Sequence, residues 1–550
     1  MARHPQFGKG PNVLAITAGQ PFFVAKIPIA SWSFAIRIWL ATVLALFVSF
    51  WLQLEAPTTA ALTIAVLAEP TRGQALDKAA FRLLATVVGV TASIAITGMF
   101  SQARDLILAA FAVWLGVCVF AAKLFDGYRA YAAVLSGYTV GLIAVQQIDH
   151  PQHVFESGLA RGAAIAVGIL SIAVVNTLIF ASGPQPGMVA QLTALHRRVR
   201  EYAREAFRRE PSNSAAFLTL LREIVALRPA IASIALESGG GSVRSAAARS
   251  AAVALVAELQ AARLKDDAGS EASAWAAEEV QRRDAEVRRD LAALRSATWP
   301  SQVWRAPMHR SWKTAAESGV RAAAWFAIAS AFYVWAGWPA ASVSLSLVAL
   351  ATGLGATTPN PRGFTAIALG GAPAAAVLAG TLEFVVLNGA DAFPVLALGL
   401  APLTIGAALL LTSRNFLWSG LGRLMLTFTM VMLSPTNPQT YNPQTFLFTT
   451  LFLVVAMSLL LAAQTLIPPV SDEKRRKRLL ADARSELLNH GHPNREAPEE
   501  AMFRAASRLE QFLAAGGAQD ARALAEMLSC SDQLAVLRRS DEKLMPRKTV

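Results

Sequence analysis

The stretch Leu67–Gly89 reads LAEPTRGQALDKAAFRLLATVVG and joins two apolar segments of the chain. Glu69 ends the first segment, and Pro70 stops its helix because proline has no N–H and its ring clashes with the preceding turn. Arg72 and Gly73 are expected to make the turn that follows. The stretch therefore predicts two apolar helices joined by a short charged connection.

Three ionisable residues open the second of these helices. Lys78 and Arg82 lie four residues apart and share a helix face, and Asp77 precedes them. Arg82 lies about one turn inside an apolar segment, where a charge is costly in lipid and marks a functional site or the interior of a helix bundle. The alternative is that Lys78 and Arg82 extend along the helix to reach the cytoplasmic headgroups.

The composition indicates a membrane protein. Of the 550 residues, 54% are hydrophobic and only 16% are charged, whereas soluble domains carry roughly 25% charged residues. The net charge of +13 comes mostly from residues beside apolar runs or in two polar regions, as expected for cytoplasmic flanks that face anionic lipid. The two cysteines, Cys118 and Cys530, imply no disulfide framework.

The apolar residues fall into two blocks of six segments, many of them about 18 to 25 residues long, as membrane-spanning helices require. Each block is followed by a polar region with helical periodicity, which predicts about four helices in the first and about three in the second. The N-terminus lacks the apolar core of a cleavable signal peptide, so the first spanning helix is expected to act as a signal anchor. The expected segments are 33–54, 57–68, 79–100, 106–124, 130–148 and 155–180, then 318–337, 340–356, 364–387, 393–411, 416–433 and 445–467.

The distribution of basic residues predicts the orientation. Lysine and arginine gather at the N-terminus and at alternate turns, and basic loops stay in the cytoplasm. We therefore expect both termini to be cytoplasmic. The expected domains are an N-terminal segment at 1–32, a first six-helix transmembrane domain at 33–181, a cytoplasmic helical domain at 182–316, a second six-helix transmembrane domain at 317–468 and a C-terminal cytoplasmic helical domain at 469–550.

The two apolar blocks resemble each other. Arg37 and Trp51 recur as Arg321 and Trp335 with the same spacing, PTRG at 70–73 matches NPRG at 360–363, and NTLI at 176–179 matches QTLI at 464–467. Each unit has an even number of expected helices, so the copies share one orientation, as in a parallel repeat. The fold class is thus an all-α membrane protein with two parallel six-helix repeats, and substrate sites in such folds lie between the halves.

The copies differ in their charges. Glu69, Lys78 and Arg82 have no charged counterparts in the second block, and Arg161 in the sixth segment has none in the twelfth. In exchange, Arg423 lies within the eleventh segment. The polar groups are therefore distributed asymmetrically over the repeat.

Three stretches together carry a resemblance to a known family. EPTRGQALDKAAFRLLATVVGV at 69–90, DGYRAYAAVLSGYT at 126–139 and LARGAAIAVGILSIAVV at 159–175 resemble the fusaric acid resistance family, which includes aromatic carboxylic acid exporters. The alternation of six apolar segments with a polar region, twice over, is similar as well. The resemblance implies an inner-membrane efflux component of Gram-negative bacteria, a class that often works with a periplasmic adaptor and an outer-membrane channel. The ninth segment departs from the pattern because it lacks the charged start.

An aromatic acid carries a carboxylate on a flat apolar ring, so it needs a cation in a dry pocket. Arginine binds carboxylates in bidentate fashion and stays charged when buried. A proton-driven exporter would also need a titratable carboxylate, for which Glu69 is the first candidate and Asp77 the second. The candidate anion-binding residues are Arg37, Arg82, Arg161, Arg321 and Arg423, and the candidate turn residues are Pro70, Arg72, Gly73 and Lys78.

Other functions are less consistent with the sequence. No GxxxxGK[ST] motif is present, which argues against direct use of ATP. The arginines of the polar regions have no interleaved aromatic residues, so we expect a solvated face and no nucleic acid partner. The histidine pairs at 150/153 and 490/492 are typical of exposed loops, so we expect neither an enzyme nor a cofactor. A gated anion channel and a membrane-anchored scaffold or sensor remain as alternatives to an exporter, and a homo-oligomer stays open.

Overall fold

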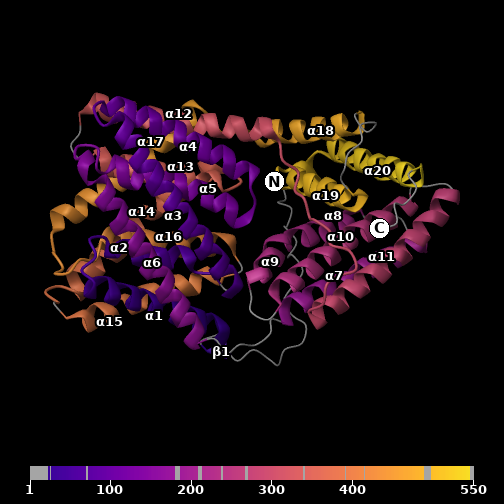
Figure 1. The fold of residues 1–550 in the computed structure, drawn as a ribbon, viewed down its shortest axis with the longest axis horizontal. Coiled ribbons are helices and arrows are strands. Elements are labelled where there is room, and N and C mark those ends of the chain that lie inside the picture. The colour runs from indigo at the N-terminus through magenta and orange to yellow at the C-terminus, as the bar shows by residue number, and fades with distance from the viewer. Residues whose placement is uncertain are drawn as a thin grey trace, which may run out of the picture.

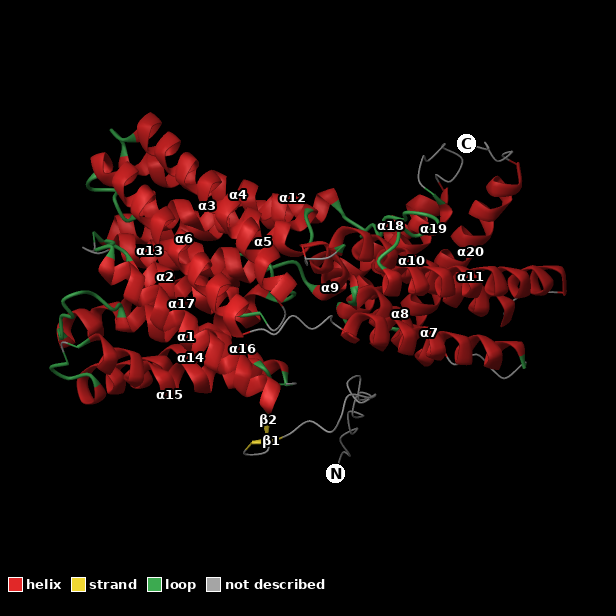
Figure 2. Cartoon of the chain, turned by 60° about the horizontal axis from the view of Figure 1, so that its bottom comes forward, coloured by secondary structure: helices red, strands yellow, loops and turns green. Residues whose placement is uncertain are grey.

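A computed structural model describes most of the chain, and the ranges it describes are 23–24, 27–69, 72–179, 186–208, 214–236, 240–266, 270–337, 341–390, 392–413, 415–488 and 497–544. The fold is helical, with a single short hairpin among these residues, β1 (Phe23–Val24) paired antiparallel with β2 (Ile27–Pro28) (Figure 2). Figure 1 shows two lobes, one formed by α1–α6 with α12–α17 and the other by α7–α11 with α18–α20.

The apolar lobe contains the helices expected from the apolar runs. Asparagine and proline mark the starts of several of these helices. The side chains of Asn360, Asn415 and Asn442 each accept a hydrogen bond from a backbone N–H in the first turn. Pro361 and Pro443 follow two of these caps, at the first helical position. The helices are α1 (Ile29–Trp51), α2 (Pro57–Leu67), α3 (Arg72–Phe100), α4 (Arg104–Leu124), α5 (Gly127–Val140), α6 (Val154–Ile179), α12 (Trp312–Ala336), α13 (Ala341–Ala356), α14 (Pro361–Thr381), α15 (Phe393–Leu411), α16 (Phe416–Leu433) and α17 (Pro443–Leu466). Single-turn π segments extend α5 (Gly141–Val145) and α14 (Leu382–Val386).

In the described part of the chain, eight helices are long and apolar enough to cross a membrane. These spans lie in α1, α3, α4, α6, α12, α14, α15 and α17. α2, α13 and α16 are apolar but shorter, and the 11 residues of α2 rise only about 16 Å, roughly half the hydrocarbon thickness. The protein is thus a helical membrane protein, while the twelve-span layout stays a prediction.

The same pairs of helices pack in each half of the apolar lobe. In the first half α1 packs on α2 and α6, α2 on α6, α3 on α5 and α6, and α4 on α5. The corresponding contacts in the second half are α12 with α13 and α17, α13 with α17, α14 with α16 and α17, and α15 with α16. Between the halves, α4 packs on α12 and α15 on α1, at opposite sides of the lobe in Figure 1, while α5 packs on α13 and α16 on α2.

Close backbone contact joins the two halves at α4 and α12. A Cβ atom on Gly116 would lie 2.8 Å from the carbonyl oxygen of Gly319, and one on Gly319 would lie 2.6 Å from that of Gly116. Such distances leave no room for a side chain, so the approach of α4 to α12 depends on glycine at both positions. Phe111 and Phe326 meet edge to face beside this contact, with ring centroids 4.5 Å apart.

The two polar regions form one helical module. It contains α7 (Pro186–Phe207), α8 (Ser214–Ala226), α9 (Arg228–Ser233), α10 (Gly241–Asp266) and α11 (Ser270–Ser296) from the first region, with the short 3₁₀ turn Ile234–Leu236. From the second it contains α18 (Asp472–Leu488), α19 (Pro498–Ala514) and α20 (Ala521–Leu544), with the turn Gly517–Gln519. A single hydrophobic core runs from α7, α8 and α10 to Phe503 and Phe512 of α19 and Met527 of α20.

Two ion-pair clusters connect this module to the apolar lobe. Asp126, between α4 and α5, pairs with Arg228 of α9, whose Nη2 lies 2.6 Å from Asp126 Oδ2, and with Arg310. Glu317, in the second turn of α12, pairs with Arg478 of α18 and with Lys474, the latter at 2.9 Å. The module is therefore attached to both halves of the lobe.

Candidate functional site

Arg82 of α3 lies in the interior of the helix bundle, with 4% of its surface exposed. Its Nη1 donates to the hydroxyl of Tyr131 on α5 at 2.7 Å, and its Nη2 donates to Thr63 Oγ1 on α2 at 3.1 Å. Its Nε is buried and has no hydrogen-bond partner in the described part of the chain. Arg82 therefore does not reach the headgroups, and neutral hydroxyls rather than a carboxylate surround its guanidinium.

A second arginine comes from α6. Arg161 lies close enough to Arg82 for their charges to repel, and the buried Tyr138 of α5 interacts with both guanidinium groups. The Nε of Arg161 is also buried without a hydrogen-bond partner among the described residues. Two like charges thus meet inside the bundle, and each retains an unpaired donor, which makes this place strongly attractive for an anion.

Glu69, which follows α2, is held by two cations. Lys78, with 5% of its surface exposed, places its Nζ 2.5 Å from Glu69 Oε1. Arg423 of α16 places its Nη1 3.6 Å from the same oxygen. The partners of Glu69 are thus Lys78 from its own half of the lobe and Arg423 from the other half.

Tyr131 connects the two groups of charges. Its hydroxyl accepts from Arg82, and the Nζ of Lys78 lies 5.6 Å from the centre of its ring. We call Thr63, Arg82, Tyr131, Tyr138 and Arg161 the arginine–tyrosine cluster, and Glu69, Lys78 and Arg423 the acid–base triad. Lys78 is buried in the triad and does not extend to the headgroups.

The tyrosines were not among the residues that the sequence singled out, although the tyrosine-rich stretch 126–139 was. Tyr131 and Tyr138 are seven residues apart, about two helical turns, and therefore project from one face of α5. Read together with an arginine at a helix interior, this spacing would have identified them. Thr63 gave no comparable signal, because it is one of three threonines in an otherwise apolar helix.

Two other candidate arginines have different surroundings. Arg37 of α1 is buried, donates from Nη1 to Asn176 Oδ1 of α6 at 3.1 Å and faces the ring of Phe34. Arg321, at the equivalent position of α12, pairs with Glu317 at 2.6 Å and donates to the carbonyl of Pro468 at 2.9 Å. Each arginine thus binds groups outside the arginine–tyrosine cluster.

The remaining candidates lie near the start of α3. Asp77 is half-buried, and its charge interacts with Arg129 and with Tyr128 of α5. Pro70 lies outside the described residues. Arg72 and Gly73 are the first two residues of α3, so the helix begins about two turns before the apolar run at 79 that marked it in the sequence.

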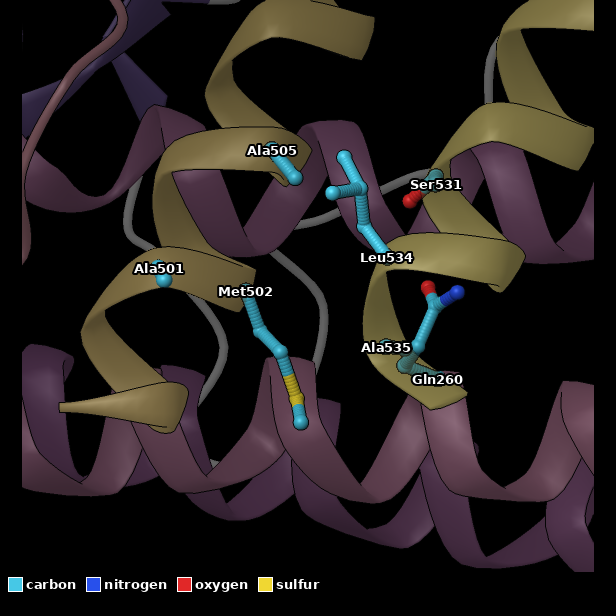
Figure 3. A pocket seen from close by; sticks show the side chains of 7 residues that line it. All are labelled: Gln260, Ala501, Met502, Ala505, Ser531, Leu534 and Ala535. Atoms are coloured by element: carbon cyan, nitrogen blue, oxygen red, sulfur yellow. The ribbon is translucent and has the colours of Figure 1, made fainter. Parts of the chain in front are cut away.

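A small pocket in the helical module lies apart from these charges. It lies between α10, α19 and α20 and is lined by Gln260, Ala501, Met502, Ala505, Ser531, Leu534 and Ala535 (Figure 3). Gln260 is engaged there, since its Nε2 donates to Asp532 Oδ1 at 2.7 Å. This lining contains no cation, so the pocket does not have the chemistry of an anion site.

Comparison with known proteins places the chain among transport proteins. The transporter YdhK of Escherichia coli K12 is 29% identical over 185 residues, which is 33% of this chain and 27% of that protein. The p-hydroxybenzoic acid efflux pump subunit AaeB of Edwardsiella tarda is 26% identical over 486 residues, 75% of this chain and 73% of that protein. The transporter GOX0755 of Gluconobacter oxydans is 30% identical over 151 residues, 26% of this chain and 20% of that protein.

The alignments with YdhK and GOX0755 thus span about a quarter of those relatives or less. No solved structure is significantly similar to the chain. The model of the fusaric acid resistance protein family matches residues 31–264 and 246–539, which together cover both halves of the apolar lobe and most of the helical module. The resemblance seen in the three sequence stretches is therefore confirmed, and the chain belongs to the fusaric acid resistance protein family.

Proposed function

We propose that this protein exports small organic anions, of the aromatic carboxylic acid or fusaric acid type, across the bacterial inner membrane. One observation carries the proposal: Arg82 and Arg161 meet inside the helix bundle with unpaired donors, and within the described ranges neither guanidinium forms an ion pair with a carboxylate. The name of AaeB, a p-hydroxybenzoic acid efflux pump subunit, supports the substrate class. Neither the family nor its transport relatives suggest an enzyme.

The cluster suits an aromatic acid for chemical reasons. A carboxylate between Arg82 and Arg161 would accept from the two Nε donors and would relieve the repulsion of the two charges. The hydroxyl of Tyr138 could then donate to a substrate oxygen, and the rings of Tyr131 and Tyr138 could pack against its ring. Arginine is suited to this role because it stays charged in a dry site, whereas a lysine there would lose its proton more easily.

Proton coupling would use the acid–base triad. Glu69 is the only acid among its three members, and it holds Lys78 from its own half and Arg423 from the other half. Protonation of Glu69 would remove the charge that holds these two cations and would weaken the contact between the halves. Loss of the proton would restore that contact. Asp77, beside Arg129, is the second candidate for this step.

The packing of the helices supports the proposed repeat. The main helix pairs that pack within one half recur within the other, and the main contacts between the halves, α4 with α12 and α5 with α13, have the exchanged counterparts α15 with α1 and α16 with α2, as expected of a pseudo-two-fold axis. Because the two polar regions share one hydrophobic core, they lie on one side of the membrane, and block 317–468 crosses it an even number of times. We propose twelve spans, with the helical module and both termini in the cytoplasm.

Partners beyond the lipid bilayer belong to the proposal as well. A periplasmic adaptor and an outer-membrane channel would carry the anion past the periplasm, and a homo-oligomer is compatible with the exposed apolar surface of the lobe. The adaptor and the channel follow from the family resemblance, and all three partners are tested by co-purification.

The test is growth of an efflux-deficient host in a panel of aromatic acids. Wild type is compared with Arg82→Gln, Arg161→Gln and Glu69→Gln at matched membrane levels, and Arg37→Gln is the control because Arg37 is equally buried but binds Asn176. We expect the three site variants to lose resistance and the control to keep it. Full resistance in the Arg82 and Arg161 variants would exclude this site.

Flux measurements separate a carrier from an anion channel. Either a pH gradient or a voltage is imposed across the membrane of everted vesicles, and the accumulation of the aromatic acid inside the vesicles is measured. A proton-driven exporter needs the pH gradient, and Glu69→Gln should abolish this dependence. Flux that follows voltage alone in wild type would favour the gated channel, with Glu69 as a structural residue, and resistance that survives loss of both arginines would favour a scaffold or sensor.

A further inference from the structure

Three buried polar side chains meet in the helical module, far along the chain from the proposed transport site. His196 comes from α7, Glu258 from α10 and Asp284 from α11. His196 Nε2 lies 2.7 Å from Asp284 Oδ1 and 4.0 Å from Glu258 Oε2. One ligand atom from each residue lies within 4.8 Å of the other two, so the three side chains converge on one small volume.

Glu258 lacks a partner in this cluster. Its side chain is fully buried, with 0% of its surface exposed, and neither carboxylate oxygen has a hydrogen-bond partner within the described ranges. The charges of Arg200 and Arg288 act on this carboxylate, but a buried carboxylate without a hydrogen bond is still strongly unfavourable. His196 does not satisfy it, because 4.0 Å is too long for a hydrogen bond.

We propose that His196, Glu258 and Asp284 form a binding site for a divalent transition metal ion, with zinc as the best match. An ion with bonds of about 2.0–2.2 Å to nitrogen and oxygen bridges two ligands that lie roughly 3.3–4 Å apart. The separation of His196 from Glu258 falls at the upper end of this range. One imidazole and two carboxylates form a set that suits zinc, whereas magnesium and calcium prefer oxygen ligands alone.

The surroundings of Asp284 supply the outer shell and an entry path. Arg288 donates from Nη2 to Asp284 Oδ2 at 2.6 Å, which orients the carboxylate and leaves Oδ1 toward His196. Arg200 Nε lies 3.1 Å from Oδ1, and its side chain is 40% exposed, so it can move into solvent when an ion takes that oxygen. The ion would replace the direct contact between His196 and Asp284 and leave a fourth position for water.

The ion would connect α7, α10 and α11 of the module. Because α10 also packs on α19, the site stabilises the core that the two polar regions share. An ion that binds only the folded module raises its stability in proportion to its affinity and concentration. This inference concerns a different part of the chain from the transport site and stands independently of the proposed substrate.

The test uses the full-length protein in detergent, stripped with chelator and titrated with zinc chloride. Bound zinc is counted by elemental analysis after desalting, and thermal unfolding is followed by tryptophan fluorescence. The background variant carries alanine at the four histidines of the two close pairs, to remove adventitious binding: His150, His153, His490 and His492. We expect about one zinc per chain and a rise in the unfolding temperature with zinc.

Matched variants decide the outcome. Glu258→Gln keeps the shape of the side chain and removes its charge, and we expect it to weaken zinc binding at least about tenfold. Asp290→Asn is the control, since Asp290 is another buried carboxylate of α11 and lies outside the cluster. If Glu258→Gln fails to fold, Co²⁺ titration of His196→Gln provides the same comparison through loss of visible absorption. Absence of zinc in the background protein, or equal affinity in Glu258→Gln, would overturn the proposal.

Discussion

Glu69 Oε1 lies 3.6 Å from Arg423 Nη1, and this ion pair joins the α2–α3 connection of one half to α16 of the other. Lys78 shares the same carboxylate oxygen at 2.5 Å. One acid therefore holds a cation from its own half, Lys78, and a cation from the other half, Arg423. A change in the protonation state of Glu69 would act on both contacts at once. Coupling of proton binding to a movement of the halves requires such an arrangement.

The first prediction concerns this pair. Arg423→Gln should leave Glu69 paired with Lys78 alone, so the halves lose one contact while the acid keeps its charge. We expect transport to continue at a reduced rate with weaker dependence on the pH gradient, whereas Glu69→Gln abolishes the dependence. Accumulation in everted vesicles, measured against the imposed pH gradient, checks this. If the double variant shows the sum of the two single effects, the two residues act independently and the coupling role is excluded.

The second prediction concerns Tyr131. Tyr131→Phe removes the hydroxyl that accepts from Arg82 at 2.7 Å, and a buried hydrogen bond to a charged group contributes about 1.5–3 kcal/mol. Without substrate, the unfolding temperature should fall. With an aromatic acid present, the ligand-induced rise should exceed that of wild type, because the carboxylate supplies the missing acceptor. The control is Tyr441→Phe, which loses a 2.9 Å hydrogen bond to the Ala390 carbonyl. This variant should have a lower unfolding temperature than wild type, but its ligand-induced rise in unfolding temperature should not exceed that of wild type.

The third prediction concerns the contact between α4 and α12. In Gly319→Val the new Cβ atom would lie 2.6 Å from the carbonyl oxygen of Gly116. The two methyl groups of the valine need still more space, so the two helices must separate. Overpacking of this kind costs about 1–3 kcal/mol or more. We expect less folded protein in the membrane and a lower unfolding temperature. Gly98→Val is the control, since a Cβ there meets nothing within 4 Å, and an equal loss in both variants would contradict the packing argument.

The helices and the buried position of Arg82 could be predicted from the sequence, and the partners of the charges could not. Apolar runs separated by proline and glycine determine the helices through local preferences and lipid solubility. The pairing of Glu69 with Arg423 depends on packing between distant helices, which a single sequence does not encode visibly. Arg37 and Arg321 illustrate the limit: the repeat relates their positions, yet Asn176 binds one and Glu317 binds the other.

The same limit applies to the helical module. His196, Glu258 and Asp284 come from three helices rich in charged residues, where no spacing distinguishes them from a solvated face. Only the packing of α7, α10 and α11 brings the three side chains together. The two histidine pairs that the sequence does make visible, at 150/153 and 490/492, are neighbours along the chain.

The last prediction concerns Asp290, a carboxylate of α11 with 1% of its surface exposed and no hydrogen-bond partner in the described ranges. Burial, with a smaller contribution from Glu286, raises its pKa from 3.8 to about 7, against the opposing charge of Arg289. The fold therefore favours the protonated form. The stability that this proton contributes is complete below pH 3.8 and is lost as the pH rises through about 7. Asp290→Asn stays neutral at every pH, so its stability should not fall over this window.

At pH 8 we therefore expect Asp290→Asn to be more stable than wild type, by as much as about 4 kcal/mol if the whole shift is expressed. At pH 4 the two proteins should be nearly equal. The measurement is thermal unfolding of the full chain in detergent at a series of pH values. Glu201→Gln on α7 is the control, because its side chain is 56% exposed and its removal should leave the pH profile unchanged. Parallel profiles for wild type and Asp290→Asn would show that Asp290 is ionised in the fold, with a cation or water satisfying it.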